Sequence, residues 1–270
     1  MSKVILVTGA SSGIGLASAT ALHHAGHNVY GTTRNINNVK NAVPFKLIQL
    51  DVTSDESADT AIAQIIKAEG KIDMLVNNAG NGIAGPAYAM PVDKAKQQFE
   101  VNFFGVVRMC SKVIPEMLKK NAGTVVNISS LGGLFGLPYQ SMYSASKYAI
   151  EGYSESMRME LVKTGIKIVT INPGDFKSDF SSNREKIPFT VDNASLKSQY
   201  DTAVAGMEKD EAAGSDPQAI GRQLVKIVAK SNPSRRYLVG AIGQTIAVTL
   251  KKALPGSLFE KLMADHYGIK

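Results

Sequence analysis

Cysteine is nearly absent from this chain of 270 residues, since Cys110 is the only one. A single cysteine cannot form a disulfide within the chain, which fits a reducing compartment. Long apolar runs are missing too, because no stretch reaches the roughly 18 residues that a membrane-spanning helix needs. The first residues, Met1 to Val4, lead straight into an apolar run and leave no room for a secretory signal. The sequence therefore predicts a cytoplasmic protein without a membrane span.

Acidic residues are scarce near the C-terminus, where the net charge of the chain is concentrated. The formal charge is +7, and residues 219–270 carry nine basic and two acidic side chains, against 21 of each in residues 1–218. Such a basic segment can contact anionic membranes, nucleic acid or acidic ligands, or it can be a solvated face without a partner. No nucleic-acid-binding motif accompanies it, so we expect no nucleic-acid partner.

Hydrophobic residues make up 44% of the chain and charged residues 20%, which are ordinary globular values. Short β-branched runs alternate with longer amphipathic stretches, the pattern of an α/β fold with a buried parallel sheet. Strands are predicted at residues 4–8, 28–33, 46–50, 72–76, 124–129, 166–171 and 236–240. Helices are predicted at residues 16–26, 53–69, 93–120, 141–164, 217–230, 244–253 and 257–266. The pattern favours one doubly wound domain of three layers over residues 1–270.

Two residues of the predicted helix over 93–120 are unusual for a helix interior. Pro115 is expected to kink the helix or to end its first part, because proline lacks a backbone donor and clashes with the preceding turn. Asn102 is also a poor helix former, since its amide competes for backbone hydrogen bonds.

Three glycines separate the first predicted strand from the first helix. Gly9, Gly13 and Gly15 lie in Gly-Ala-Ser-Ser-Gly-Ile-Gly. Glycines let the backbone turn tightly and approach a pyrophosphate, and the helix N-terminus offers free N–H groups and a positive dipole end. The context predicts a dinucleotide site, and a strand-to-helix turn without a ligand is the alternative.

Acidic residues are absent between Leu16 and Leu50. In NAD-binding folds an acid near the end of the second strand accepts the ribose hydroxyls. Arg34 stands just past that strand instead, and a guanidinium suits a 2′-phosphate. This favours NADP(H) over NAD(H), although NAD(H) stays possible, and an ordinary exposed loop arginine is the alternative.

Tyr143 and Lys147 are four residues apart, a spacing that places both side chains on one face of a helix. An ammonium beside a phenol favours the phenolate, so we expect Lys147 to lower the pKa of Tyr143 and to make it a proton donor and acceptor. Ser130 closes the strand upstream with a hydroxyl. A surface pair without function is the alternative.

Two segments in the last third of the chain are expected to shape a binding site. Residues 175–216 are polar and weakly periodic, which predicts a mobile lid with short helices. Residues 241–270 are predicted to form a helical extension. Apolar spacing at Ile246, Leu250, Leu254, Leu258 and Leu262, continued at His266, indicates helices that cover the pocket or a subunit contact.

The motifs follow one another in a recognisable order. They are Thr8-Gly9-x3-Gly13-x-Gly15, Asp51-Val52, Asn77-Asn78-Ala79-Gly80, Asn102, Ser130, Tyr143-x3-Lys147 and Pro173-Gly174. In this order and spacing the chain resembles the short-chain dehydrogenase/reductase family from Met1 to about Gly174. The resemblance implies a Rossmann-like fold with a seven-stranded parallel sheet in the strand order 3-2-1-4-5-6-7. It also implies hydride transfer between a nicotinamide and the carbon of an alcohol or carbonyl.

Asn102, Ser130, Tyr143 and Lys147 match the catalytic four of that family. Tyr143 would move the proton and Ser130 would bond the substrate oxygen, so both would bind substrate. Lys147 would hold the nicotinamide ribose, and Asn102 would support a water chain to Lys147. The implied cofactor contacts are Gly9, Ser11, Ser12, Gly13, Ile14, Gly15, Arg34, Asp51, Val52, Asn78, Ala79, Gly80, Tyr143, Lys147, Pro173, Gly174, Phe176 and Ser178. Ser178 stands where the family often has threonine.

Within the family, residues 131–138 and 143–161 are most similar to the 17β-hydroxysteroid and retinol dehydrogenase branch, which implies a small, fairly apolar alcohol or ketone as substrate. Two other functions stay open: a 3-oxoacyl-carrier reductase with its acidic carrier on the basic tail, and a dinucleotide-binding sensor without catalysis. The resemblance also implies a homodimer or homotetramer through the helices at 93–120 and 141–164. No metal site is expected, because nothing completes the pair of His23 and His27.

Overall fold

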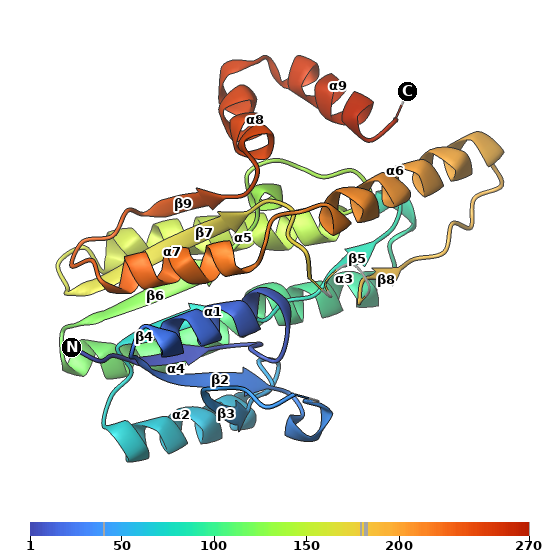
Figure 1. Ribbon diagram of the computed structural model, residues 1–270. Coiled ribbons are helices and arrows are strands. Elements are labelled where there is room, and N and C mark those ends of the chain that lie inside the picture. The colour runs from blue at the N-terminus through green and yellow to red at the C-terminus, as the bar shows by residue number, and fades with distance from the viewer. Residues whose placement is uncertain (40, 179, 181–182, 270) are drawn as a thin grey trace.

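The computed structural model describes residues 1–39, 41–178, 180 and 183–269. At its centre lies a seven-stranded sheet in the order β3-β2-β1-β4-β6-β7-β9, and every pairing in it is parallel (Figure 1). The strands are β1 Val4–Val7, β2 Asn28–Thr33, β3 Lys46–Gln49, β4 Met74–Asn77, β6 Gly123–Ile128, β7 Ile166–Pro173 and β9 Arg236–Val239. The predicted strand order is confirmed. Two further strands, β5 Ile83–Ala84 and β8 Glu185–Lys186, pair with each other in a separate small sheet.

Helices cover both faces of the sheet. The helices of the described residues are α1 Gly13–His24, α2 Asp55–Glu69, α3 Val92–Phe99, α4 Gly105–Lys119, α5 Ser141–Glu160, α6 Ala194–Ala212, α7 Gln218–Val228, α8 Ile242–Ala253 and α9 Gly256–His266. One face buries side chains of α2, α4 and α5, and the other buries side chains of α1 and α7. Across the described ranges, no helix is long and apolar enough to cross a bilayer.

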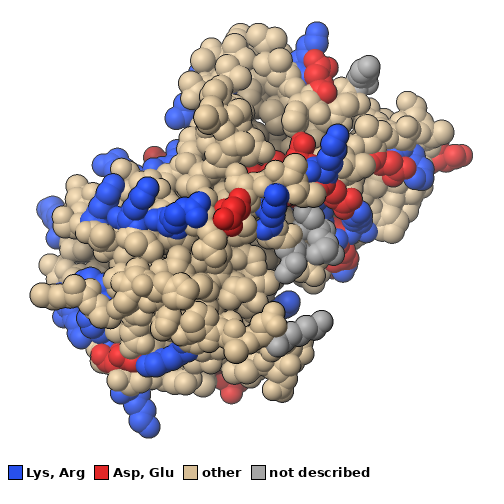
Figure 2. Space-filling model, in the orientation of Figure 1, with Lys and Arg blue, Asp and Glu red and all other residues tan. Residues whose placement is uncertain are grey.

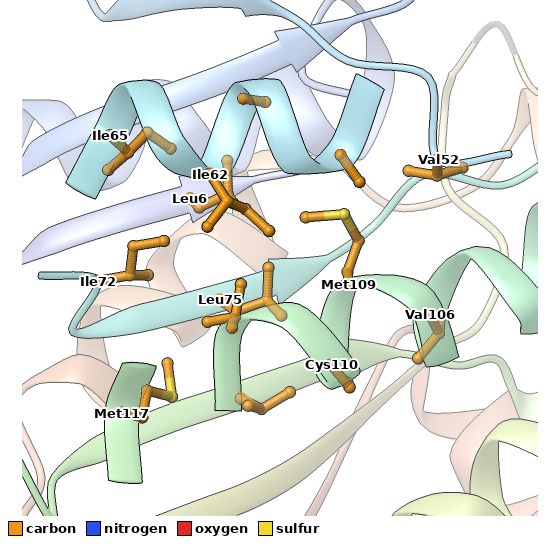
Figure 3. Packing of buried hydrophobic residues seen from close by; sticks show 14 of the residues in the cluster. Leu6, Val52, Ile62, Ile65, Ile72, Leu75, Val106, Met109, Cys110 and Met117 are labelled. Carbon is orange, nitrogen blue, oxygen red and sulfur yellow. The ribbon is translucent and has the colours of Figure 1, made fainter. Parts of the chain in front are cut away.

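The strands are buried on both faces because successive side chains point to opposite sides of the sheet. Leu6 and Leu75 belong to the cluster under α2 and α4, whereas Ile5 and Met74 belong to the cluster under α1 and α7. Figure 3 shows the first cluster, with Ile62 of α2 and residues of α4 closing over the strands. Cys110 lies in this cluster with no exposed surface, as a packing residue, and burial raises the pKa of its thiol to about 12.

Local signals in the sequence define the ends of α2. The Ser54 hydroxyl accepts a hydrogen bond of 3.2 Å from the backbone N–H of Ser57, which caps the helix N-terminus. Gly70 follows the last turn with φ of 68°, in the left-handed region where glycine is favoured. The predicted range of 53–69 is therefore correct within two residues.

The helix predicted over 93–120 is interrupted, but not at Pro115. A π-helical turn, Glu100–Phe104, separates α3 from α4, and Asn102 lies within it. Pro115 lies inside α4, which continues to Lys119, so the prediction that it would end the first part is wrong. The extra residue of a π-turn turns side chains away from the regular helical positions, and such turns are frequent at functional sites.

The segment predicted as a lid contains one long helix rather than several short ones. Within residues 175–216, α6 runs for 19 residues, from Ala194 to Ala212. Tyr200, Val204 and Met207 form a small cluster on its inner side. Residues 179 and 181–182 of this segment, and residue 270 of the extension, lie outside the described residues.

The helices α8 and α9 lie beyond the edge of the sheet, above α5 and α6 in Figure 1. Val248 and Phe259 pack on Leu131 and Phe135, with the two phenyl rings 5.5 Å apart. Of the apolar positions used for the prediction, Leu254 packs against this cluster, whereas Ile246, Leu250, Leu258 and Leu262 are exposed. The buried face is thus offset from the one that spacing alone indicated.

Candidate active site

The functional residues gather where β1, β4, β6 and β7 end. Parallel strands present their carboxyl ends at one edge of a sheet, where the connecting loops can form a site. Gly9 follows β1, Asn78 follows β4, Ser130 follows β6, and Pro173 ends β7.

The glycine turn after β1 fits a dinucleotide diphosphate. Gly9 has φ of 66° and Gly13 has φ of 51°, which are left-handed values. A Cβ atom at Gly15 would overlap the Gly9 carbonyl oxygen. The Ser12 side chain makes no capping hydrogen bond to α1, so the helix N-terminus presents backbone N–H groups that can donate hydrogen bonds to an anion. The turn therefore combines close backbone approach with free donors.

Asn78 holds the glycine turn in place. Its side-chain amide donates to the carbonyl oxygens of Thr8 at 2.9 Å and Gly9 at 3.0 Å. The Thr8 hydroxyl in turn accepts from the backbone N–H groups of Asn78 at 2.9 Å and Ala79 at 3.0 Å. The structure thus brings the predicted residues Gly9, Asn78 and Ala79 together.

Asp51 and Arg34 stand near this turn at the ends of neighbouring strands. The Asp51 carboxylate accepts from the Thr53 backbone N–H at 2.9 Å and from its hydroxyl at 2.8 Å. Arg34 follows β2 and is exposed. None of the ion pairs in the described part of the chain includes Arg34. Its guanidinium is therefore available to an added anion.

The remaining predicted cofactor residues differ in how much of their side chain is available. Ser178 lies over the glycine turn, since a Cβ at Gly13 would stand 3.2 Å from the Ser178 Cβ. Val52 and Phe176 are buried in the two apolar clusters, and Ile14 packs against one of them. The Phe176 side chain lies in the core against the sheet, and the cofactor contact expected at Phe176 stays a prediction.

Tyr143 and Lys147 share one face of a helix, as their spacing predicts, and Ser130 lies beside Tyr143. Tyr143 and Lys147 lie on α5, with the Lys147 Nζ 5.7 Å from the Tyr143 ring centroid. Ser130 hydrogen-bonds the Tyr143 phenol, and its hydroxyl accepts from the Gly132 backbone N–H at 3.0 Å. The Lys147 ammonium donates to the carbonyl oxygen of Ile128 at 2.9 Å.

The predicted effect of Lys147 on Tyr143 is wrong in this structure. Burial raises the pKa of Tyr143 to about 12, and the hydrogen bond with Ser130 opposes this rise only partly. Burial also lowers the pKa of Lys147 to about 8, opposed by the charge of Glu151. Desolvation disfavours both charged forms, and the ammonium is bonded to Ile128 rather than to the phenol. The neutral phenol is therefore the form present at neutral pH.

Asn102 connects the π-turn to the loop after β4. Its Oδ1 accepts from the Asn81 backbone N–H at 2.9 Å. Its Nδ2 donates to the Asn81 carbonyl at 3.1 Å and to the Ser146 hydroxyl at 3.1 Å. These bonds fix the loop beside α5, and the predicted water chain from Asn102 to Lys147 stays a prediction.

The sequence analysis missed an acidic pocket that begins at Asp175, just after β7. The pocket has a volume of about 260 Å³, and Asp175, Asp210, Gln244 and His266 are among the residues that line it. The Gln244 amide bonds the Asp175 carboxylate, and Asp210 pairs with His266 at 3.2 Å. Burial raises the pKa of Asp175 to about 6, and the charges of Glu211 and Asp210 add to the rise. The charges of Glu211 and Asp175 also act on Tyr143.

A buried arginine completes the polar groups near Tyr143. Arg184 forms an ion pair with Glu211 and lies 5.4 Å from the ring centroid of Phe180, which in turn lies 5.6 Å from the Tyr143 ring. The only sequence signal for the acidic pocket was the position of Asp175 directly after Pro173-Gly174. Arg184 and Gln244 carried none, because they reach the site from distant segments.

A glycine turn at a helix N-terminus, at the carboxyl edge of a doubly wound parallel sheet, is the geometry of a dinucleotide-binding protein. Comparison with known proteins gives the family. The family model described as short chain dehydrogenase matches residues 3–187. The chain belongs to the short-chain dehydrogenase/reductase family and is an NAD(P)-dependent dehydrogenase or reductase.

Individual relatives extend over nearly the whole chain. The chain is 39% identical over 268 residues to a 3-ketodihydrosphingosine reductase of Bacteroides thetaiotaomicron, covering 99% of both proteins. It is 32% identical over 279 residues to retinol dehydrogenase 8 of Bos taurus, covering 95% of this chain and 88% of the relative. A crystal structure of a short-chain dehydrogenase from Streptomyces avermitilis superposes with a TM-score of 0.79 at 29% identity, covering 97% of this chain and 96% of the other.

Proposed function

We propose that the protein is an NADP(H)-dependent reductase of a long-chain amino ketone of the 3-ketodihydrosphingosine kind. The observation that carries the proposal is the acidic pocket lined by Asp175, a carboxylate whose charge acts on Tyr143. The relative from Bacteroides thetaiotaomicron supports it, since its named substrate combines a ketone with an amino group on a long alkyl chain.

The proton in the proposed reduction comes from Tyr143. Because burial keeps the pKa of the phenol at about 12, Tyr143 is protonated at neutral pH and can donate to the ketone oxygen. Ser130, bonded to the same phenol, stabilises the negative charge that develops on that oxygen. The reduced nicotinamide, when bound, supplies the hydride to the carbonyl carbon. Hydride and proton together convert the ketone to a secondary alcohol.

Asp175 is the proposed partner of the substrate amino group. Burial raises the pKa of its carboxylate to about 6, and repulsion by Glu211 and Asp210 adds to the rise. A bound ammonium would relieve that repulsion, because an opposite charge at short range favours the ionised carboxylate. Glu211 is paired with Arg184 and Asp210 with His266, whereas Asp175 accepts only from the neutral amide of Gln244 among the hydrogen bonds of the described residues, so Asp175 is the carboxylate proposed for a cation.

The loop over residues 131–137 is the proposed site for the alkyl chain. Leu131 and Phe135 are buried there beneath Val248 of α8 and Phe259 of α9. An apolar wall next to the acidic pocket suits a substrate with a charged head and a hydrocarbon tail. In this proposal the C-terminal extension and the segment over 175–216 enclose the substrate.

The cofactor preference rests on Arg34. The exposed guanidinium at the end of β2 can form charge-assisted hydrogen bonds to a 2′-phosphate. The glycine turn and the N-terminus of α1 would hold the diphosphate, and Asp51 and Asn78 would contact the adenosine side.

The test compares two ketones that differ in charge. Purified protein and NADPH are mixed with 3-ketodihydrosphingosine or with its N-acetyl derivative, which is neutral, and NADPH consumption is followed. The amino ketone should give a kcat/KM at least about tenfold higher, the scale of one charged hydrogen bond. For the amino ketone alone, kcat/KM should rise as the pH rises through about 6, because Asp175 must ionise to bind the cation.

Asp175→Asn is the matched variant for this test. It keeps the size of the side chain and removes the charge, so it should abolish both the preference for the amino ketone and the rise near pH 6. Reduction of neither ketone by the wild type would refute the proposed activity. Equal kcat/KM values for the two ketones would refute the role of Asp175 in selecting the substrate.

The subunit contact also belongs to this proposal. Helices α4 and α5, predicted as the contact, carry exposed apolar side chains, among them Leu118, Tyr148 and Met159. Unpartnered apolar surface of this kind is typical of protein–protein interfaces. Light scattering should give the mass of a dimer or tetramer, and a Met159→Lys substitution should reduce it.

A further inference from the structure

Glu151 is a buried carboxylate one turn beyond Lys147 on α5. It is 7% exposed, and its spacing from Tyr143 and Lys147 places all three on one stripe of the helix. A carboxylate is rarely buried unless it is paired and hydrogen-bonded. The proposed reaction does not use Glu151 directly, so its contacts require another explanation.

The contacts of Glu151 lead to the backbone of Ser130. Glu151 Oε1 accepts a hydrogen bond of 2.7 Å from Asn172 Nδ2. The same amide nitrogen donates to the Ser130 carbonyl oxygen at 2.9 Å. Glu151 therefore orients the Asn172 amide, and the amide holds the residue whose hydroxyl contacts Tyr143.

The second carboxylate oxygen binds the edge of the sheet. Glu151 Oε2 accepts from Arg236 Nη2 of β9 at 2.6 Å. The charges that act around Glu151 are Lys147 and Arg158 on α5 and Arg236 on β9. Glu151 is thus held from both sides and cannot turn away from Asn172 without losing an ion pair.

The charge of Glu151 also acts on Lys147. Lys147 is buried, and burial lowers the pKa of its ammonium, while the attraction of Glu151 opposes that effect. Lys147 and Asn172 donate to two carbonyl oxygens at the end of β6, those of Ile128 and Ser130. Glu151 acts on both donors, because it accepts a hydrogen bond from Asn172 and attracts the charge of Lys147.

We propose that Glu151 is a positioning residue that fixes Ser130 through Asn172 and supplies the buried counter-charge to Lys147. For its effect on turnover this inference rests on the proposed function. Its effect on Lys147 can be measured without any substrate.

The first test is a titration of Lys147 by NMR. The ¹³Cε resonance of Lys147, assigned by its loss in Lys147→Arg, is followed against pH in the wild type and in Glu151→Gln. Removing the negative charge should lower the pKa of Lys147 by about one unit, the scale of a nearby opposite charge. If Glu151 only packed the helix, its replacement would admit water and raise the pKa of Lys147 toward its ordinary value.

Two further variants keep this test decisive. Arg236→Gln removes a positive charge near the same carboxylate, so it should leave the pKa of Lys147 unchanged or raise it. This variant can be measured even if Glu151→Gln does not fold. Glu69→Gln is the matched control, because Glu69 is also paired, with Lys46 at 3.0 Å, but lies at the far end of the sheet. A fall in the pKa of Lys147 in Arg236→Gln or in Glu69→Gln would overturn the electrostatic role of Glu151. An unchanged pKa of Lys147 in Glu151→Gln would overturn it too.

The second test uses turnover and separates charge from position. In this proposal the alkaline limb of the pH profile of kcat/KM follows the deprotonation of Lys147. In Glu151→Gln that limb should move to lower pH by about one unit. Asn172→Ser removes the donor to Ser130 and keeps Glu151. In this variant kcat should fall on the order of tenfold, and the pH of the alkaline limb should not change. Thermal unfolding and NADPH titration confirm that the variants fold and bind. A wild-type kcat in Asn172→Ser would overturn the positioning role.

Discussion

Arg34→Ala is expected to remove most of the preference for NADPH over NADH. Charge-assisted hydrogen bonds contribute roughly 1.5–3 kcal/mol, which corresponds to about tenfold to a hundredfold in affinity. Arg34 is exposed, so solvent and salt screen its charge. We therefore expect the lower end of the range, about tenfold, at physiological ionic strength.

The measurement is a fluorescence titration with each cofactor. The chain has no tryptophan, so the nicotinamide fluorescence of NADPH and NADH reports binding without a tryptophan background. Arg34→Ala should weaken NADPH binding and leave NADH binding unchanged. Raising the salt concentration should shrink the preference of the wild type but not that of the variant.

Arg222→Ala is the matched control, because Arg222 is exposed on α7, a helix that packs on α1 and carries no residue predicted to contact the cofactor. Figure 2 shows many Lys and Arg side chains on the face where α7 lies, so a general charge effect has to be separated from a local one. Equal losses in the two variants would indicate general attraction of an anionic cofactor. Tighter binding of NADH than of NADPH by the wild type would refute the argument from the second strand.

Three further outcomes are expected. Tyr143→Phe should lower turnover by a factor on the order of 10² or more while NADPH binding is retained, and near-normal turnover would remove Tyr143 from the mechanism. Leu75→Ala, at a fully buried position, should lower the free energy of unfolding by about 2–5 kcal/mol in chemical denaturation, whereas the exposed Ile246→Ala should change it by no more than about 0.5 kcal/mol. Deleting residues 243–270 should raise KM for the ketone, because α8 and α9 cover the loop at Leu131. Pelleting of the full chain, but not of the truncated one, with anionic liposomes at physiological salt would instead favour membrane contact.

The sequence by itself determined the elements and the local geometry of the motifs. Strands and helices follow from side-chain periodicity, and the glycine turn follows from backbone freedom at Gly9 and Gly13. The spacing of Tyr143 and Lys147 places them on one helix face wherever that helix lies in the fold. These features depend on residues a few positions apart, so a pattern along the chain is sufficient to predict them.

Resemblance to a family carried the prediction further than spacing could. The strand order and the meeting of Ser130 with Tyr143 depend on how segments pack, and periodicity does not state which strands are neighbours. The motif order over residues 1–174 supplied that information, and the sheet confirms it.

Only the tertiary structure decided the electrostatics and the contacts between distant segments. The pKa of Tyr143 is set mainly by burial and not by its neighbour on the helix. Glu151 meets Asn172, 21 residues away, and Arg236, 85 residues away. Desolvation and Coulomb energies depend on distance in space and on the surrounding medium, which residue order does not encode. For the same reason the buried face of α8 and α9 could be assigned only after the loop beneath them was placed.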